Sequence, residues 1–379
     1  DNAASGGFKP PCVQQAVAHT LKSLSANPGR SGHALSLAAA ELVYRARGQI
    51  ADFFGCADAD RVIFTSGCTA ALNLGLFGTA QKGHIIATAD AHNAVLRPLF
   101  ELERRGGVRL TILPPSAHAG VPPEAVAAAM QPDTYLVALS HVGNVNGIRT
   151  ELQGMGAFCA YKNALLLVDA AQSAGHIEIN MEKAGIDLLA VAPHKGLHGP
   201  QGIGALLCGA RVKNLRPTVF GGTGGMSESR TQPALFPEGY EAGTLNTPGI
   251  AGFAAGVAYT RAHFSEFAGR LSALTKYLHK GLQRIKNVRL YAPPSPACGV
   301  VSFVIDGITP QETADILSGE YDVAVRAGLH CAPLMHKYLG TAATGGTVRA
   351  SLSPLNRHEE IDFFLAAVDE LADRAPERV

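Results

Sequence analysis

The chain has 379 residues, of which 47% are hydrophobic and 17% are charged, and its formal net charge is +1. This near-neutral balance, without a long run of like charges, argues against a nucleic-acid-binding face or a membrane-surface patch. No run of about 18 apolar residues occurs, so we expect no membrane-spanning helix. The chain begins at Asp1 rather than at methionine, and we expect the natural start to lie upstream.

Seven cysteines are scattered along the chain, and no two of them have the C-x-x-C spacing. An odd, scattered set argues against a disulfide framework and against a structural zinc site. The simplest compartment for such a chain is a reducing cytoplasm. Because a buried cysteine is usually inert, we expect at most one or two of the seven to be reactive.

Apolar runs typical of buried strands alternate with helical stretches in the first two thirds of the chain. We expect strands at 61–67, 84–90, 134–141, 164–170, 187–193 and 204–209, and helices at 37–54 and 123–131. This alternation predicts an α/β fold with a mostly parallel sheet covered by helices. Ligands of such sheets bind in the loops that leave the carboxyl ends of the strands.

The pattern changes after residue 250. A long helical region at 252–285 is followed by a strand-like run at 299–306 and by further α and β segments. We predict a large α/β domain over 16–255 and a smaller α+β domain over 256–379. The N-terminal segment, 1–15, is expected to lie against the smaller domain.

The segment LLVDAAQSAGH places Asp169 at the end of an expected strand. Because an unpaired buried charge is costly, this carboxylate needs a partner, which is either a helix N-terminus or a cationic ligand. Lys195, in APHKGLHGPQGIG, follows the next strand 26 residues later. Without this context, Lys195 would be interpreted as an ordinary lysine in a surface loop. An aspartate for a pyridinium nitrogen and a lysine for a Schiff base are together the needs of pyridoxal phosphate chemistry.

Three other strand ends carry polar side chains. TSGCTAALNLG places Cys68 and Thr69 where a helix begins, and such a site suits a phosphate as well as an ordinary cap. His92 of DAHNAVLRP could stack on a cofactor ring and move protons, or be structural. Asn144 of HVGNVNG stands in a similar place, where Asn beside Gly also suits a simple turn.

One cysteine, Cys331, lies in a distinctive segment, RAGLHCAP, with His330 beside it and Arg326 five residues upstream. Nearby cations lower the pKa of a thiol and raise its thiolate fraction. The other six cysteines are expected to be small buried side chains. Arg349 of GTVRASLSPLN is a candidate clamp for a substrate carboxylate, the alternative being a surface ion pair.

Taken in order, these motifs resemble those of the class V, fold-type I pyridoxal-phosphate enzymes. Within that class the chain is similar to the cysteine desulfurases and selenocysteine lyases, with a group II-like catalytic segment. The motifs that carry the resemblance are DNAAS, NPGRSGHALS, FTSGCTAALN, AHNAVLRP, VDAAQSAG, HKGLHGPQGIG, EAGTLNTPGI, RAGLHCAP and VRASLSPLN. The resemblance implies a seven-stranded-type sheet and a smaller C-terminal α+β domain.

The resemblance also implies a role for each matching residue. The catalytic residues are Lys195, which forms the Schiff base, His92, which stacks on the ring and transfers protons, and Cys331, which accepts sulfur. The other cofactor-binding residues are Asp169 at the pyridine nitrogen, Gln172 at the phenolic oxygen, and Cys68, Thr69 and His194 at the phosphate. Thr244 would reach the phosphate of a neighbouring subunit, which implies a homodimer with shared active sites. The substrate-binding residues are Asn144, Arg349 and Arg326.

Two positions depart from the family pattern. Ala192 stands where a phosphate-binding serine is common, and Leu329 stands where the closest group II pattern has a histidine. The expected reaction converts L-cysteine to L-alanine and leaves a persulfide on Cys331 for a sulfur-acceptor protein. The alternatives are a selenocysteine lyase, a β-eliminating lyase, a transaminase and a non-catalytic scaffold. A dinucleotide enzyme is disfavoured because no G-x-G-x-x-G follows the first strand.

Overall fold

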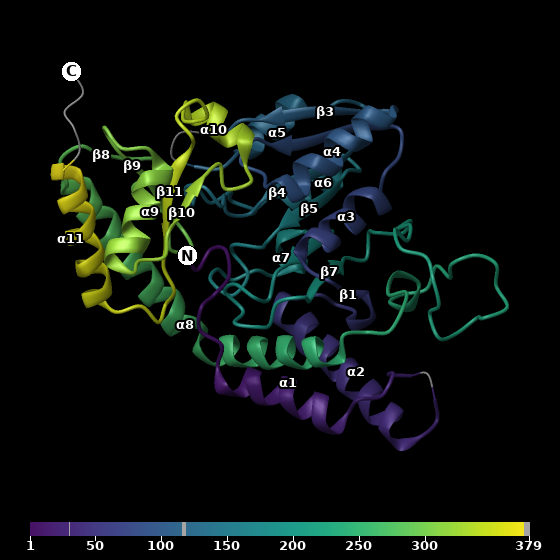
Figure 1. Ribbon diagram of the computed structural model, residues 1–379. Coiled ribbons are helices and arrows are strands. Elements are labelled where there is room, and N and C mark those ends of the chain that lie inside the picture. The colour runs from purple at the N-terminus through teal and green to yellow at the C-terminus, as the bar shows by residue number, and fades with distance from the viewer. Residues whose placement is uncertain (30, 116–118, 375–379) are drawn as a thin grey trace.

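The computed structural model describes residues 1–29, 31–115 and 119–374, so Arg30 of the NPGRSGHALS segment lies outside the described residues. The larger part of the molecule contains the strands β1 (Val62–Thr65), β2 (Gly83–Thr88), β3 (Val108–Leu113), β4 (Thr134–Ser140), β5 (Leu165–Asp169), β6 (Leu188–Val191) and β7 (Gly204–Cys208). They form one seven-stranded sheet in the order β1, β7, β6, β5, β4, β2 and β3 (Figure 1). β7 is antiparallel to both neighbours, and the other neighbouring pairs are parallel. The predicted α/β fold with a mostly parallel sheet is confirmed.

Six of the seven strands lie where apolar runs predicted them, and β3 was not predicted. β3 is an edge strand, and its residues after Val108 are only partly covered. Arg109 in this strand forms an ion pair with Asp133 at 2.7 Å. Because an edge strand buries less of its surface, its sequence mixes polar and apolar residues and lacks the continuous apolar run of a central strand.

The central strands are buried on both faces. In β5, Leu166 and Val168 belong to one apolar core and Leu167 belongs to the other. The first core also contains Ile50 of α2 and Phe253 of α8. The helices over the two faces are α2 (Ala34–Phe54), α3 (Cys68–Gly78), α4 (Asn93–Arg105), α5 (Pro123–Ala129), α6 (Met155–Tyr161), α7 (Met181–Ala184) and α8 (Thr247–Arg284), with 3-10 turns η1 (Ala59–Arg61) and η2 (Glu238–Tyr240).

One helix, α8, connects the two parts of the molecule (Figure 1). The Oδ1 atom of Asn246 caps it by accepting a hydrogen bond from the Gly249 N–H at 3.0 Å. Phe253 near its start packs in the core of the large sheet, and Leu278 near its end packs in the core of the small one. The predicted domain boundary at 255/256 therefore falls inside a continuous helix, and the domain limits remain a prediction.

The smaller part is built on an antiparallel sheet of β8 (Val288–Leu290), β9 (Val300–Ile305), β10 (Arg326–Gly328) and β11 (Thr347–Ser351), in the order β10, β11, β9 and β8. Its helices are α9 (Pro310–Tyr321), α10 (Pro333–Leu339) and α11 (His358–Arg374). Within the described ranges no helix combines the length and the apolar character that crossing a membrane requires.

The N-terminal segment lies between the two parts. The Ala3 N–H donates to Ser351 Oγ of β11 at 3.0 Å, and the Gly6 N–H donates to the His194 carbonyl at 2.9 Å. The helix that follows, α1 (Pro11–Ser23), packs along α8. The first residues thus contact the small sheet as expected, whereas residues from Pro11 onward pack on α8.

Candidate active site

A cavity of about 360 Å³ opens at the carboxyl ends of β4, β5 and β6. The two parts of the molecule both contribute to its walls. Ten of the twelve predicted site residues line it: Cys68, Thr69, His92, Asn144, Asp169, Gln172, His194, Lys195, Arg326 and Arg349. The parallel topology explains this grouping, because strand ends that are distant in sequence meet at one edge of the sheet.

Asp169 and Lys195 follow two neighbouring strands. Asp169 is the last residue of β5, and Lys195 comes four residues after β6, which pairs with β5. Burial lowers the pKa of the Lys195 ammonium, and the Asp169 carboxylate opposes that shift. One Asp169 oxygen accepts a hydrogen bond from the Ala171 N–H at 2.9 Å. The residues after Asp169 form a turn, so the carboxylate is not a helix cap.

The start of α3 offers an anion site at the cavity wall. Gly67 is the N-cap residue of this helix and supplies no side-chain cap, so the first amides, beginning with Cys68 and Thr69, are open to a ligand. Nothing lies within 4 Å of the position that a Gly67 Cβ would occupy. Burial and the nearby Asp169 raise the pKa of the Cys68 thiol well above its usual value, so Cys68 is a neutral thiol.

Arg349 and Asn144 lie together on one side of the cavity. Arg349 is 1% exposed, and its guanidinium donates to the Asn144 carbonyl at 3.1 Å and to Asp1 Oδ1 at 2.8 Å. Its Nε atom and the Asn144 Oδ1 atom are buried and have no hydrogen-bond partner among the described residues. Two unpaired polar atoms on the cavity wall are a site that a polar ligand would complete.

His92 and Gln172 form another part of the cavity wall. The His92 Nδ1 atom accepts a hydrogen bond from the Ala94 N–H at 3.0 Å, which fixes the ring at the N-terminus of α4. Burial lowers the pKa of His92, so the ring is neutral near pH 7. Gln172 donates through Nε2 to the Ala3 carbonyl at 3.1 Å. Burial lowers the pKa of His194, which also lines the cavity, to about 4.

The remaining two predicted residues lie outside this lining. Cys331 is next to the cavity, because Arg326 Nη2 lies 3.3 Å from its sulfur and its carbonyl accepts from the Asn93 N–H at 2.7 Å. Thr244 is exposed and lines a different groove, next to Gly202 and Asn246. The structure thus brings the thiol to the site but leaves Thr244 away from the cavity of its own chain.

Sequence reasoning missed three features of the site. Ala3 and Ser66 line the cavity, and Asp1 forms an ion pair with Arg349. DNAAS contributes only to the family resemblance, and no local pattern in it predicts contact with a residue 348 positions away. Ala192, one of the two departures from the family pattern, lines the cavity without a hydroxyl group, and Leu329, the other, is 39% exposed.

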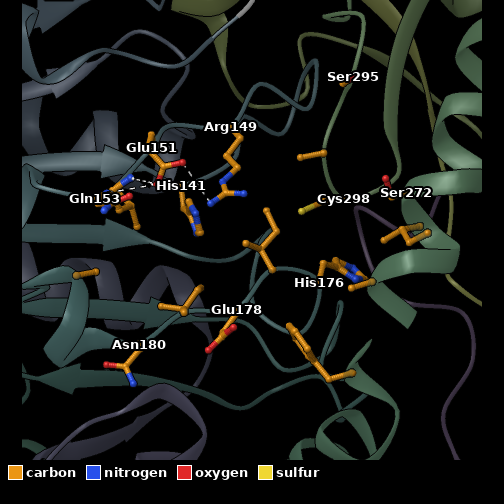
Figure 2. A pocket seen from close by; sticks show the side chains of 18 of the residues that line it. His141, Arg149, Glu151, Gln153, His176, Glu178, Asn180, Ser272, Ser295 and Cys298 are labelled. Atoms are coloured by element: carbon orange, nitrogen blue, oxygen red, sulfur yellow. Dashed lines mark hydrogen bonds and ion pairs between the residues drawn. The ribbon is translucent and has the colours of Figure 1, made fainter. Parts of the chain in front are cut away.

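A second, larger groove of about 790 Å³ lies elsewhere between the two parts (Figure 2). Its walls include His141, Arg149 and Cys298, and Arg149 forms an ion pair with Glu151 at 3.5 Å. None of the twelve predicted site residues lines it. Burial raises the pKa of the Cys298 thiol to about 12, so this thiol lacks the reactivity expected of a nucleophile. Size alone therefore does not identify the active site.

The fold, with a lysine and an aspartate after neighbouring strands of a mostly parallel sheet, defines a class of pyridoxal-phosphate-type enzyme. The chain belongs to the aminotransferase class-V family, which it matches over residues 1–364.

Two curated relatives and one solved structure show which enzymes within this family the chain is similar to. The chain is 33% identical to a probable cysteine desulfurase of Methanothermobacter thermautotrophicus, over 98% of this chain and 94% of that one. It is 30% identical to cysteine desulfurase IscS of Shewanella loihica, over 97% and 91% of the two chains. The solved apo structure of cysteine desulfurase from Thermococcus onnurineus is similar, with a TM-score of 0.90 and 32% identity over 99% of this chain and 94% of that one.

Proposed function

We propose that this protein is a pyridoxal-phosphate-dependent cysteine desulfurase that converts L-cysteine to L-alanine and leaves a persulfide on Cys331. The observation that carries the proposal is the Cys331 thiol beside the Arg326 guanidinium, at 3.3 Å, next to the cavity that contains Lys195 and Asp169. The Arg326 guanidinium donates a hydrogen bond to this sulfur and so holds it at the edge of the cavity. The names of the relatives support the same reaction.

The residues fit pyridoxal 5'-phosphate. Asp169 and Lys195 provide a carboxylate for a ring nitrogen and an amine for a Schiff base, and the uncapped start of α3 suits a phosphate. His194 and Thr69 would contact the phosphate, Gln172 the phenolic oxygen and His92 the ring face. When bound, the cofactor supplies an electron sink for the pair left on the substrate α-carbon.

Each side chain then has a defined task. Arg349 holds the carboxylate of the amino acid, and Asn144 helps to position the substrate. Lys195 removes the α-proton, and its lowered pKa suits this step because a base must be unprotonated. The Cys331 thiolate attacks the substrate sulfur, so that an S–S bond forms while the C–S bond breaks with its electron pair on carbon. Proton transfer to that carbon and return of the α-proton by Lys195 give alanine, and His92 carries the proton of the substrate thiol.

The first test is a product assay with wild-type protein and the Cys331→Ser variant. L-Cysteine and a reductant are supplied, and alanine, pyruvate and sulfide are quantified. We expect alanine and equal sulfide from the wild type, a loss of about 100-fold or more in Cys331→Ser, and full activity in the control Cys12→Ser. Pyruvate from both proteins would identify a β-eliminating lyase, and activity with selenocysteine alone would identify a selenocysteine lyase.

The proposal also covers a second subunit, a sulfur-acceptor protein and the cellular location of the enzyme. Thr244 is exposed and lines a neighbouring groove rather than the cavity of its own chain, which suits contact with the cofactor phosphate of a second subunit in a homodimer. Cys331 is only partly buried, so a persulfide there could reach a sulfur-acceptor protein. All seven cysteines are free thiols, which suits a cytoplasmic location.

A further inference from the structure

The Cys331 sulfur is positioned by an unusual backbone turn over residues 329–332. The Ala332 N–H donates to the Leu329 carbonyl at 2.9 Å, which closes the turn. The two central residues, His330 and Cys331, have φ values of 48° and 58°. Turns with two positive φ values favour Asn and Gly, and a side chain such as that of Cys331 rarely adopts this conformation. Other contacts must therefore hold the turn.

Three hydrogen bonds hold the turn from three different elements. The Asn144 Nδ2 atom, after β4, donates to the His330 carbonyl at 2.6 Å. The Asn93 N–H, at the start of α4, donates to the Cys331 carbonyl at 2.7 Å. The His330 Nε2 atom lies 3.0 Å from Thr347 Oγ1 of β11. The His330–Thr347 contact is the one of the three that uses the side chain of a turn residue.

The His330 ring is buried and uncharged. Its side chain is buried, with 2% of the residue exposed, and its ring centroid lies 5.5 Å from that of His336. Burial lowers the pKa of His330, and the nearby Arg349 acts in the same direction. A neutral ring in this place can exchange one hydrogen bond with Thr347 without adding a charge beside Arg349. It is therefore an anchor for the turn.

We propose that His330 is a positioning residue, whose contact with Thr347 holds the left-handed turn and so points the Cys331 sulfur at Arg326 and the cavity. The nucleophilic role of Cys331 rests on the proposed function. The anchoring of the turn does not, because it is a property of the backbone. Misplacement of a reacting group by about 1 Å can cost about 100-fold in rate, so loss of the anchor should lower turnover without weakening substrate binding.

The test compares two substitutions of Thr347 that differ in whether they keep its hydroxyl group. Thr347→Val keeps the shape of the side chain and removes the hydroxyl, whereas Thr347→Ser keeps the hydroxyl. For the Thr347→Val holoenzyme we expect kcat for alanine to fall about tenfold or more while KM stays within about twofold. Amide hydrogen exchange at Ala332 and Asn93, which donate the turn's backbone bonds, should become at least about tenfold faster. Thr347→Ser should behave like the wild type in both measurements.

A second variant, at His330 itself, keeps the proposal testable if Thr347→Val does not fold. His330→Ala has no ring to reach Thr347 and, unlike Asn, has no preference for positive φ that could hold the turn by itself, and we expect the same fall in kcat and the same loss of protection. Wild-type kcat with wild-type exchange in either folded variant would overturn the proposal. Thr347→Ser as defective as Thr347→Val would also overturn it. If the wild type makes no alanine through Cys331, the proposed function fails, and the exchange measurement still decides the role of His330.

Discussion

At the residue scale, burial decides which titratable side chains are charged. Burial lowers the pKa of Lys195, which suits the base that we propose for the α-proton. Several buried histidines are neutral for the same reason. Burial lowers the pKa to about 4 for His141, His176, His194 and His336. The same effect that prepares a site for proton transfer therefore makes the fold sensitive to acid.

We expect the free energy of unfolding to fall as the pH falls from 6.5 towards 4. Above pH 6.5 these histidines are neutral in both states. Below it the unfolded chain binds protons at the ordinary pKa of 6.5, and the native state does not until about 4. Each such group can lower stability by up to about 1.4 kcal/mol per pH unit. Urea unfolding midpoints at pH 7.5, 6.0 and 5.0 measure the effect.

The control is His336→Asn, whose side chain can keep the hydrogen bond that His336 Nδ1 makes with Thr341 Oγ1 at 2.7 Å. This variant removes one titrating group, so its stability should change less between pH 7.5 and 5.0 than that of the wild type. An identical pH dependence for the two proteins would show that His336 is protonated equally in the folded and unfolded states.

At the element scale, the start of α3 depends on close contact with β7. Gly204 opens β7, and a Cβ atom there would lie 2.5 Å from the Gly67 carbonyl carbon and 2.8 Å from the Cys68 nitrogen. Contacts this short between backbone atoms cannot be relieved by a side-chain rotation. Gly204, the last glycine of GPQGIG, thus allows β7 to pack closely against the start of α3.

We expect Gly204→Ala to displace the start of α3 and to weaken pyridoxal phosphate binding by about tenfold or more, since a misplaced helix start loses its amide contacts. Overpacking should also cost about 1–3 kcal/mol of stability. Equilibrium titration of the apoprotein with pyridoxal phosphate measures the first effect, and thermal unfolding measures the second.

The matched control is Gly48→Ala in α2, where nothing lies within 4 Å of the new Cβ atom. It should bind the cofactor like the wild type and gain about 0.5–1 kcal/mol of stability, because alanine is the better helix residue. Unchanged cofactor affinity in Gly204→Ala would contradict the packing argument.

At the scale of the whole molecule, the proposed role of Thr244 requires a second subunit. If each Thr244 serves the partner's site, a mixed dimer of Lys195→Ala and Thr244→Asp chains contains one intact site. Asp at 244 would place a negative charge against the phosphate and disable the site it faces. We expect either variant alone to be inactive and their co-expressed mixture to regain about a quarter of wild-type activity, for random pairing in a two-fold dimer.

Light scattering gives the assembly mass that this prediction requires, which is twice the 39.5 kDa of one chain. The contrary result is a dimer whose mixture stays inactive, since a Thr244 that acts in its own chain leaves every mixed site with one defect. A monomeric mass would remove the shared-site proposal altogether.

The sequence by itself determined the class of fold and most of the side chains of the candidate site. Central strands buried on both faces are continuous apolar runs, and polar residues at their ends are visible as interruptions, as at Asp169 and His92. The edge strand β3 escaped prediction because the partial burial of an edge strand leaves a mixed sequence. Site residues at strand ends can be recognised because a parallel sheet always gathers them at one edge.

Only the tertiary structure decided which distant segments complete the cavity. The contact between Asp1 and Arg349, the hold of Thr347 on His330 and the approach of Gly204 to Gly67 join residues that no local pattern relates. The positive φ values at His330 and Cys331 likewise come from contacts with three other elements, since neither residue favours that conformation strongly on its own. Functional side chains at a strand end or in a loop can be recognised from the residues beside them in the sequence. Packing between elements, in contrast, depends on the folded arrangement of the entire chain.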